Sequence, residues 1–200
     1  MRRITPLSLC CTLLVATLWA HAESVTPETA RALAASTEQT LVELNSVVVD
    51  QYFHQGQFEQ CVTILNRVIE LNPIGTDAYS TITWLLWSTG RSQEAIPYNA
   101  RMVANNPTDP DAYFQVGVFY VRLKNDEEAV KWLAKAVELG LPSPQRHMYG
   151  LALTRLGRNA EALAFWQRVL ADDPKDAIAR REIDRLNAKL TPAPTDDKVK

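Results

Sequence analysis

The sequence repeats itself along most of its length, at intervals of 34, 34 and 33 residues. Three columns show the register: a turn residue, a small residue, and a tyrosine or leucine. They are Gly56, Gly90, Lys124 and Gly157; Cys61, Ala95, Ala129 and Ala162; and Tyr52, Leu86, Tyr120 and Leu153. Proline closes three of the four units, at Pro73, Pro107 and Pro174. A fixed period of this length indicates stacked structural repeats.

The columns also predict local structure within each unit. Glycine tolerates the left-handed cap that ends a helix, so the first helix of a unit should end at its glycine. Where Lys124 replaces glycine, we expect its neighbour Asn125 to adopt that conformation. The small column should let the second helix pack closely on the first. Three residues stand directly before a proline and are predicted to be helix N-caps: Thr26, Asp109 and Ser143.

The period and the column types resemble the tetratricopeptide repeat, a helix–turn–helix unit of about 34 residues. The resemblance covers about residues 42–176 and is carried most clearly by residues 52–61 and 149–162. It implies an all-α solenoid of about four units coiled into a right-handed superhelix. We expect the units to span residues 42–75, 76–109, 110–142 and 143–176. Such a resemblance also implies that ligands lie in a concave groove lined by the first helices.

The segments that flank the repeats suggest export and capping. A positive start, an apolar stretch of 13 residues and the sequence Ala20-His21-Ala22 predict a signal peptide over residues 1–22, cut after Ala22. The protein would then be periplasmic or secreted, and an uncleaved membrane anchor is the alternative. Residues 23–41 are predicted to form an N-terminal helical extension, residues 177–190 a capping helix, and residues 191–200 a disordered tail.

Composition excludes several functional classes. The chain is 46% hydrophobic and 22% charged with a net charge of −2, which is typical of a globular protein and lacks the basic face of a nucleic-acid binder. Beyond residue 22 the chain holds only His54, His147 and Cys61 among its histidines and cysteines. We therefore expect no metal, no cofactor, no small-molecule substrate and no enzymatic activity. The remaining catalytic hypothesis is a pair of Cys61 with His54, against which Cys61 fills the small packing column.

Helical spacing selects the side chains of the first helices that point away from the packing columns. Exposed aromatic residues in a concavity are typical anchors for a partner's apolar side chains. For Phe53 and Trp87, packing against a neighbouring helix is an equally supported interpretation. The candidate groove residues are Ser46, Asp50, Phe53, His54, Ser80, Trp84, Trp87, Phe114, Val118, Arg122, His147, Leu151 and Arg155.

One subclass of the family holds C-terminal carboxylates with a clamp of lysine, asparagine and arginine. None of the matching positions in this sequence carries a positive charge, which excludes that subclass; they are Ser46, Asp50, Thr81, Asp111 and Gln115. The sequence thus predicts a non-enzymatic scaffold that binds a peptide or helix of a protein partner, in assembly or maintenance of a cell-envelope complex. The alternative is a structural subunit that associates with copies of itself.

Overall fold

The computed structural model describes residues 36–37, 39–41, 43, 46–47 and 49–190. The chain divides into two compact units, residues 1–43 and residues 44–200, and every helix with defined bounds belongs to the second. The predicted signal peptide and C-terminal tail lie outside the described residues. Of the predicted extension over residues 23–41, the described positions 36–37 and 39–41 are helical.

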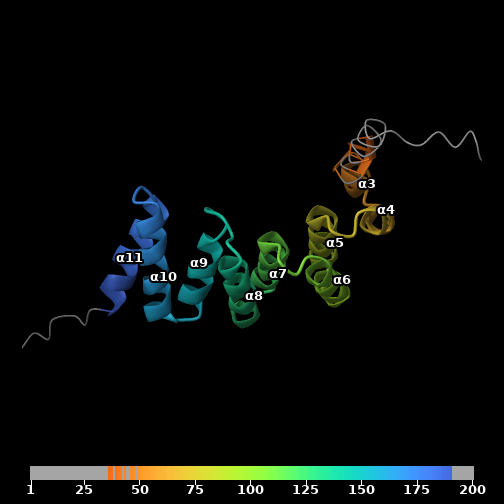
Figure 1. The fold of residues 1–200 in the computed structure, drawn as a ribbon. Coiled ribbons are helices and arrows are strands. Elements are labelled where there is room, and N and C mark those ends of the chain that lie inside the picture. The colour runs from red at the N-terminus through yellow and green to blue at the C-terminus, as the bar shows by residue number, and fades with distance from the viewer. Residues whose placement is uncertain (1–35, 38, 42, 44–45, 48, 191–200) are drawn as a thin grey trace, which may run out of the picture. The chain divides into compact units, whose positions relative to one another are not determined.

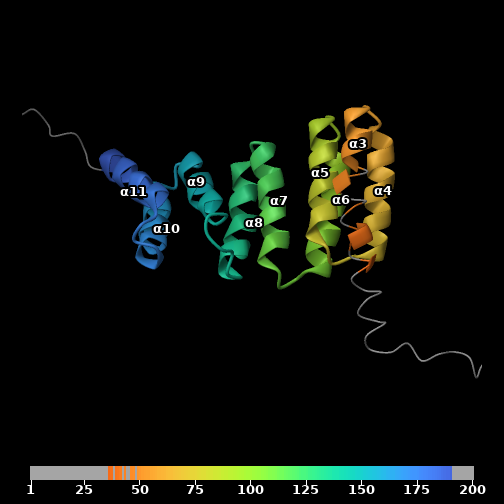
Figure 2. The ribbon, with the colours of Figure 1, turned by 90° about the horizontal axis from the view of Figure 1, so that it is seen from above.

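Residues 44–200 contain helices that follow one another in pairs and then end in a single helix (Figure 1). The pairs are α3 (Val49–His54) with α4 (Phe58–Leu71), α5 (Thr76–Ser88) with α6 (Ser92–Asn105), α7 (Pro110–Arg122) with α8 (Asp126–Glu138), and α9 (His147–Arg155) with α10 (Asn159–Asp172). Helix α11 (Ala177–Leu190) comes last. The helices pack in chain order (Figure 2), and no strand occurs among the residues that the structure describes. The predicted all-α solenoid is confirmed.

The turn between the two helices of a pair uses the left-handed conformation. Gly56, Gly90 and Gly157 have φ values of 71°, 78° and 73°, as predicted. In the third pair Lys124 itself adopts φ 57°, so the prediction for Asn125 is wrong. The Asn125 backbone N–H donates to the Tyr120 carbonyl at 3.0 Å and closes the turn. This bond requires the left-handed conformation at position 124, whichever residue type stands there. Asn125 instead caps α8, because its side chain accepts from the Glu128 N–H at 3.1 Å.

Close contact between paired helices depends on small residues. The predicted small column, Cys61, Ala95, Ala129 and Ala162, has no exposed surface. Two glycines in the first helices have the same role. A Cβ at Gly117 would lie 2.6 Å from the Leu133 side chain, and a Cβ at Gly150 would lie 2.5 Å from the Trp166 ring. These positions therefore set how near the two helices of a pair can approach.

The start of α7 follows the prediction and the start of α9 does not. Asp109 caps α7 by accepting from the Asp111 N–H at 2.9 Å, with Pro110 in the first turn. Ser143 is not an N-cap, because residues 143–146 form a turn and α9 begins at His147. That turn is held by the His147 N–H, which donates to the Pro144 carbonyl at 3.0 Å. The third predicted cap, Thr26, lies outside the described residues.

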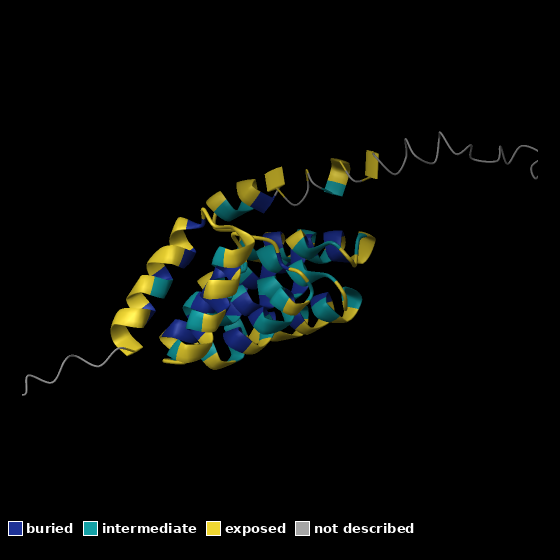
Figure 3. Cartoon of the chain, turned by 60° about the vertical axis from the view of Figure 1, so that its left-hand side comes forward, coloured by how far each residue is buried: buried dark blue, intermediate teal, exposed yellow. Residues whose placement is uncertain are grey.

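Helix α11 packs against α10 through a narrow stripe. Its buried residues, Ala179, Glu182 and Leu186, recur at intervals of three and four, and the remainder of the helix is largely exposed (Figure 3). Ala179 and Leu186 join the same buried cluster as Trp166 and Leu153 of the last pair. The helix thus covers apolar surface of the last repeat. No helix in the described ranges has the length and apolar character needed to cross a bilayer.

Candidate functional site

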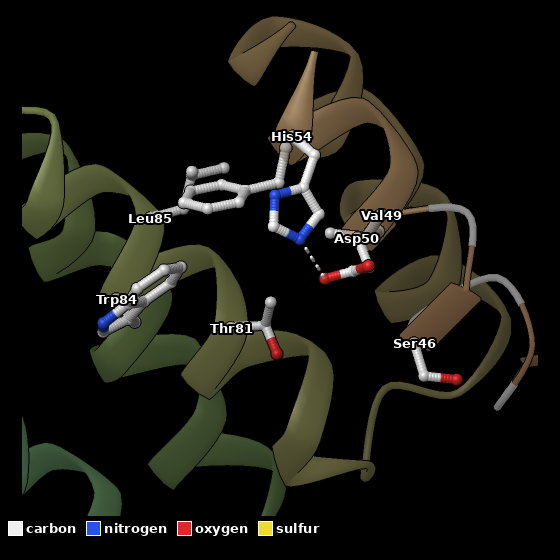
Figure 4. Close-up of a pocket in the computed structure, with 8 residues that line it drawn as sticks. Ser46, Val49, Asp50, His54, Thr81, Trp84 and Leu85 are labelled. Carbon is white, nitrogen blue, oxygen red and sulfur yellow. Dashed lines mark ion pairs between the residues drawn. The ribbon is translucent and has the colours of Figure 1, made fainter. Parts of the chain in front are cut away.

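A pocket of about 220 Å³ lies between α3 and α5, and we call it the Trp84 pocket (Figure 4). Its wall combines apolar side chains with a polar edge. The lining residues are Ser46, Val49, Asp50, Phe53, His54, Thr81, Trp84 and Leu85. Both helices are the first of their pair, as expected for a groove formed by first helices.

Aromatic rings form one wall of the Trp84 pocket. The Phe53 ring centroid lies 5.3 Å from that of Trp84, with the planes tilted by 46°, and 5.5 Å from that of Phe58. Phe53 and Trp84 are half-buried, so each keeps part of its surface open. Asp50 and His54 form the polar edge, with Oδ1 and Nε2 3.4 Å apart and side chains 67% and 72% exposed. The pocket therefore offers an apolar surface beside an exposed carboxylate–imidazole pair.

A second pocket of about 320 Å³ lies between α5 and α7, and we call it the Arg122 pocket. Its lining residues are Ser80, Thr81, Trp84, Gln115 and Arg122. Thr81 and Trp84 line both pockets, so the two adjoin across the face of α5. We call the two pockets together the groove.

The second pocket is polar and contains a cation. The Arg122 guanidinium carbon lies 5.8 Å from the centre of the Trp87 ring, in cation–π geometry. Burial lowers the pKa of Arg122, but an arginine remains charged at neutral pH. The Gln115 amide donates to Asp111 at 3.2 Å and keeps its second N–H. The arrangement can receive a negatively charged or strongly accepting group.

The structure brings together seven of the thirteen candidate groove residues. Those that line the groove are Ser46, Asp50, Phe53, His54, Ser80, Trp84 and Arg122. Four further residues line the groove that helical spacing did not select: Val49, Leu85, Thr81 and Gln115. Val49 and Leu85 are buried, and their apolar character gives no sign that they also border a pocket. Thr81 and Gln115 occupy positions that the clamp comparison had already singled out.

Four further candidates pack beside the groove or on the core. Trp87 lies under the guanidinium of Arg122 and lines neither pocket, so packing is the better interpretation for it. Phe114 and Leu151 are half-buried against the cluster that contains Leu133 and Trp166. Val118 is half-buried and does not line the groove.

The groove prediction is wrong for His147, and Arg155 is exposed but lines neither pocket. His147 is buried, its Nε2 lies 2.6 Å from the Asp176 carboxylate, and its ring lies 5.4 Å from that of Trp166. It therefore faces the turn that precedes the capping helix α11. Arg155 forms a bidentate ion pair with Asp126, the shortest contact being 2.6 Å, and so links α9 to α8.

The cysteine–histidine hypothesis finds no matching geometry. Cys61 is fully buried, its Sγ donates to the Val49 carbonyl at 3.4 Å, and burial raises the pKa of its thiol. His54 is exposed and faces Asp50. Cys61 therefore acts as a small packing residue. Across the described residues, no group of three or more histidine, cysteine, aspartate and glutamate side chains is placed to hold a metal ion.

Paired helices in chain order, with a groove along their first members, define a helical-repeat protein. Residues 84–144 and residues 147–176 each match a family model described as tetratricopeptide repeat. The chain is a tetratricopeptide repeat protein. No curated protein matches its sequence.

Solved structures share the fold at low sequence identity. MamA is 17% identical with a TM-score of 0.56, and the match covers 71% of this chain and 84% of that one. YrrB is 21% identical with a TM-score of 0.52, covering 70% and 73%. PilF of Pseudomonas aeruginosa is 19% identical with a TM-score of 0.55, covering 75% and 70%. At these identities the likeness shows the fold alone.

Proposed function

We propose that this chain is a non-enzymatic scaffold that binds a peptide segment of a partner protein in the groove. The observation that carries the proposal is the half-buried pair of Phe53 and Trp84, whose rings lie 5.3 Å apart in the wall of a pocket. Both rings keep part of their surface open in the pocket, where a partner side chain can cover it. YrrB, one of the similar structures, is described as having an unusual peptide-binding site, which supports this choice.

Aromatic side chains in a partly enclosed pocket are effective anchors. They bury a large apolar area when a partner side chain enters, and they lose little conformational freedom in doing so. A pocket of about 220 Å³ suits one large aliphatic or aromatic side chain of a peptide. The adjoining Arg122 pocket supplies polar contacts for a neighbouring residue of the same peptide. The groove thus provides an apolar anchor site and, next to it, a polar contact for the same peptide.

We further propose that the protein is exported and acts on a partner in the cell envelope. Support comes from the first 22 residues, whose basic start, apolar stretch and Ala-His-Ala ending are typical of a cleaved leader. N-terminal sequencing of the protein from a periplasmic or culture-medium fraction tests the proposal. A mature chain that starts at Glu23 supports it, and retention of Met1 with the protein in the cytosolic fraction contradicts it.

The binding proposal is tested by capturing a partner from cell-envelope extract with the immobilised protein. Trp84→Ala and Phe53→Ala are expected to abolish capture while far-ultraviolet circular dichroism stays unchanged. Tyr98→Ala serves as the control, since it removes a half-buried aromatic side chain from α6 that lines neither pocket of the groove. Equal capture by the wild type and both groove variants would contradict the proposal.

A second candidate function is self-association, and one observation favours it. Leu71 and Ile74, at the turn between α4 and α5, are 57% and 64% exposed. Large apolar side chains exposed together are typical of an interaction surface. Light scattering over a range of protein concentrations separates the two functions. A monomer at every concentration removes self-association, and a defined oligomer that Leu71→Ser disrupts favours it.

A further inference from the structure

We infer that the groove selects peptides in which an acidic side chain lies near a large apolar one, with Arg122 receiving the carboxylate. The inference rests on the proposed function, since it names the chemistry of the peptide that the groove would bind.

The first observation is that Arg122 has no carboxylate partner among the described residues. No ion pair and no hydrogen bond of its guanidinium occurs with any residue that the structure describes. Other arginines of the repeats are paired: Arg91 with Glu94, Arg146 with Asp172, and Arg155 with Asp126. Within the described ranges, Arg101 and Arg168 also lack a carboxylate partner, but both are exposed to water. Arg122 therefore differs in being both unpaired and half-buried.

The second observation is the surroundings of the guanidinium. Its carbon lies 5.8 Å from the Trp87 ring centre, which holds the group against an aromatic face and removes part of its hydration. The ring accepts no N–H hydrogen bond of the usual kind, so the guanidinium donors remain unsatisfied by the described residues, and an incoming carboxylate would accept from them. The planar fork of an arginine matches a carboxylate in bidentate geometry. The site is thus prepared for an anion of this shape.

The remaining side chains of the Arg122 pocket limit what can bind. The hydroxyls of Ser80 and Thr81 both donate to the Asp77 carbonyl, at 3.0 and 2.8 Å. Arg122, the second N–H of Gln115 and the indole N–H of Trp84 are therefore the donors left for a ligand in this pocket. One cation beside two neutral donors suits a single side-chain carboxylate. The clamp positions that hold a terminal carboxylate elsewhere in the family carry no cation in this chain.

The two pockets impose an order on the peptide. Because Thr81 and Trp84 border both, a peptide that fills the Trp84 pocket can extend directly into the Arg122 pocket. Asp50 lies at the edge of the Trp84 pocket and would repel a second carboxylate there. An acidic residue is therefore directed toward the Arg122 side. The expected ligand combines a large aliphatic or aromatic residue with an aspartate or glutamate on one side of it.

The test uses the full chain and a phage library of random dodecapeptides fused through their C-termini, so that no free terminal carboxylate is displayed. Selection is run on the wild type, on Arg122→Glu, and on Arg101→Glu as the control with the same change in charge. We expect the wild type and Arg101→Glu to enrich peptides with an acidic residue at a fixed distance from an apolar one. Arg122→Glu should enrich lysine or arginine at the acidic position.

The best peptide is then synthesised with blocked ends in a glutamate and a glutamine form. Hydrogen bonds to a charged group contribute about 1.5–3 kcal/mol, so glutamine should weaken binding to the wild type by about tenfold or more. The ratio of the Kd of the glutamine form to that of the glutamate form should persist with Arg101→Gln and fall to near unity with Arg122→Gln. Arg122→Lys, which keeps the charge and tests for a folding defect, should give an intermediate ratio.

Three results would overturn the inference. Peptides that bind in a Trp84-dependent manner without acidic preference would contradict it and leave the proposed function standing. A preference that survives Arg122→Gln would show that another group receives the carboxylate. Failure of every displayed peptide and of the synthetic peptide to bind would contradict both the inference and the proposed function.

Discussion

Nε2 of His147 lies 2.6 Å from Oδ2 of Asp176, and both side chains are buried. The other oxygen of the same carboxylate accepts from the Ala179 N–H at 2.9 Å, in the first turn of α11. A single carboxylate thus joins the start of α9 to the start of the last helix. This contact holds α11 over apolar surface that the last repeat would otherwise expose.

Asp176 should therefore contribute a pH-dependent part of the stability. Burial raises its pKa, but the hydrogen bond from Ala179 and the contact with His147 outweigh burial, so the pKa of Asp176 lies below its ordinary value. The contribution of Asp176 to the free energy of unfolding is full above the ordinary aspartate pKa of about 3.9. It is lost as pH falls through the lower pKa of Asp176 in the folded state. Urea unfolding from pH 3 to pH 7 measures this.

In that experiment Asp176→Asn is expected to be less stable at pH 7 by about 1–3 kcal/mol, and its free energy of unfolding should fall less steeply below about pH 4. Asp173→Asn is the control, because Asp173 is exposed and its side chain accepts from the nearby Lys175 N–H. Identical acid slopes for the wild type and Asp176→Asn would show that the contact with His147 does not couple stability to pH.

Gly150→Ala should destabilise the fold although alanine favours helices. The new methyl group would lie 2.5 Å from the Trp166 ring and 2.7 Å from the Phe165 ring, and both rings are buried. Overpacking of this kind costs about 1–3 kcal/mol, against a gain of about 1 kcal/mol from helix propensity. Chemical denaturation measures the balance. A variant as stable as the wild type, or more stable, would show that the last helix pair can separate at no cost.

Lys124→Gly is expected to stabilise the third repeat. Lys124 has φ 57°, where a residue with a Cβ is strained and glycine is not. The expected gain is about 0.5–1 kcal/mol, because glycine also has more freedom to lose on folding. The reverse change, Gly90→Lys, should destabilise the fold, because Gly90 also has a positive φ that strains a residue with a Cβ. A Cβ there meets nothing within 4 Å, so the effect reports the backbone conformation alone. Thermal unfolding of both variants provides the comparison, and changes of the same sign would contradict this explanation.

The repeat columns predict the helix pairs because each column has one physical role. A left-handed turn at Gly56 and a tight helix contact at Ala95 are local requirements, and a residue type expresses each of them directly. Lys124 shows that residue type alone does not always predict which residue adopts the left-handed conformation. The turn imposes its conformation on whichever residue occupies the position, so the preference of Asn125 had no effect.

The groove could be predicted only in part because burial depends on neighbouring elements. Helical spacing places Trp84 and Arg122 on the open face, and both line pockets. The same spacing placed His147 there, but Asp176, directly before the capping helix, contacts its ring, and the residue is buried. Leu85 is buried by its neighbours and borders a pocket as well. These outcomes arise from contacts between helices, which no periodic pattern in one helix contains.

The most direct test of the account is site-specific photocrosslinking from position 81, whose side chain lines both pockets. A benzophenone amino acid replaces Thr81, the protein is irradiated in cell-envelope extract, and mass spectrometry identifies the linked peptide. We expect one partner peptide that contains a large apolar residue. It should be linked from position 81, not linked from position 98 on α6, and lost with Trp84→Ala. Adducts of the same composition from both positions, or an adduct that Trp84→Ala leaves unchanged, would contradict it.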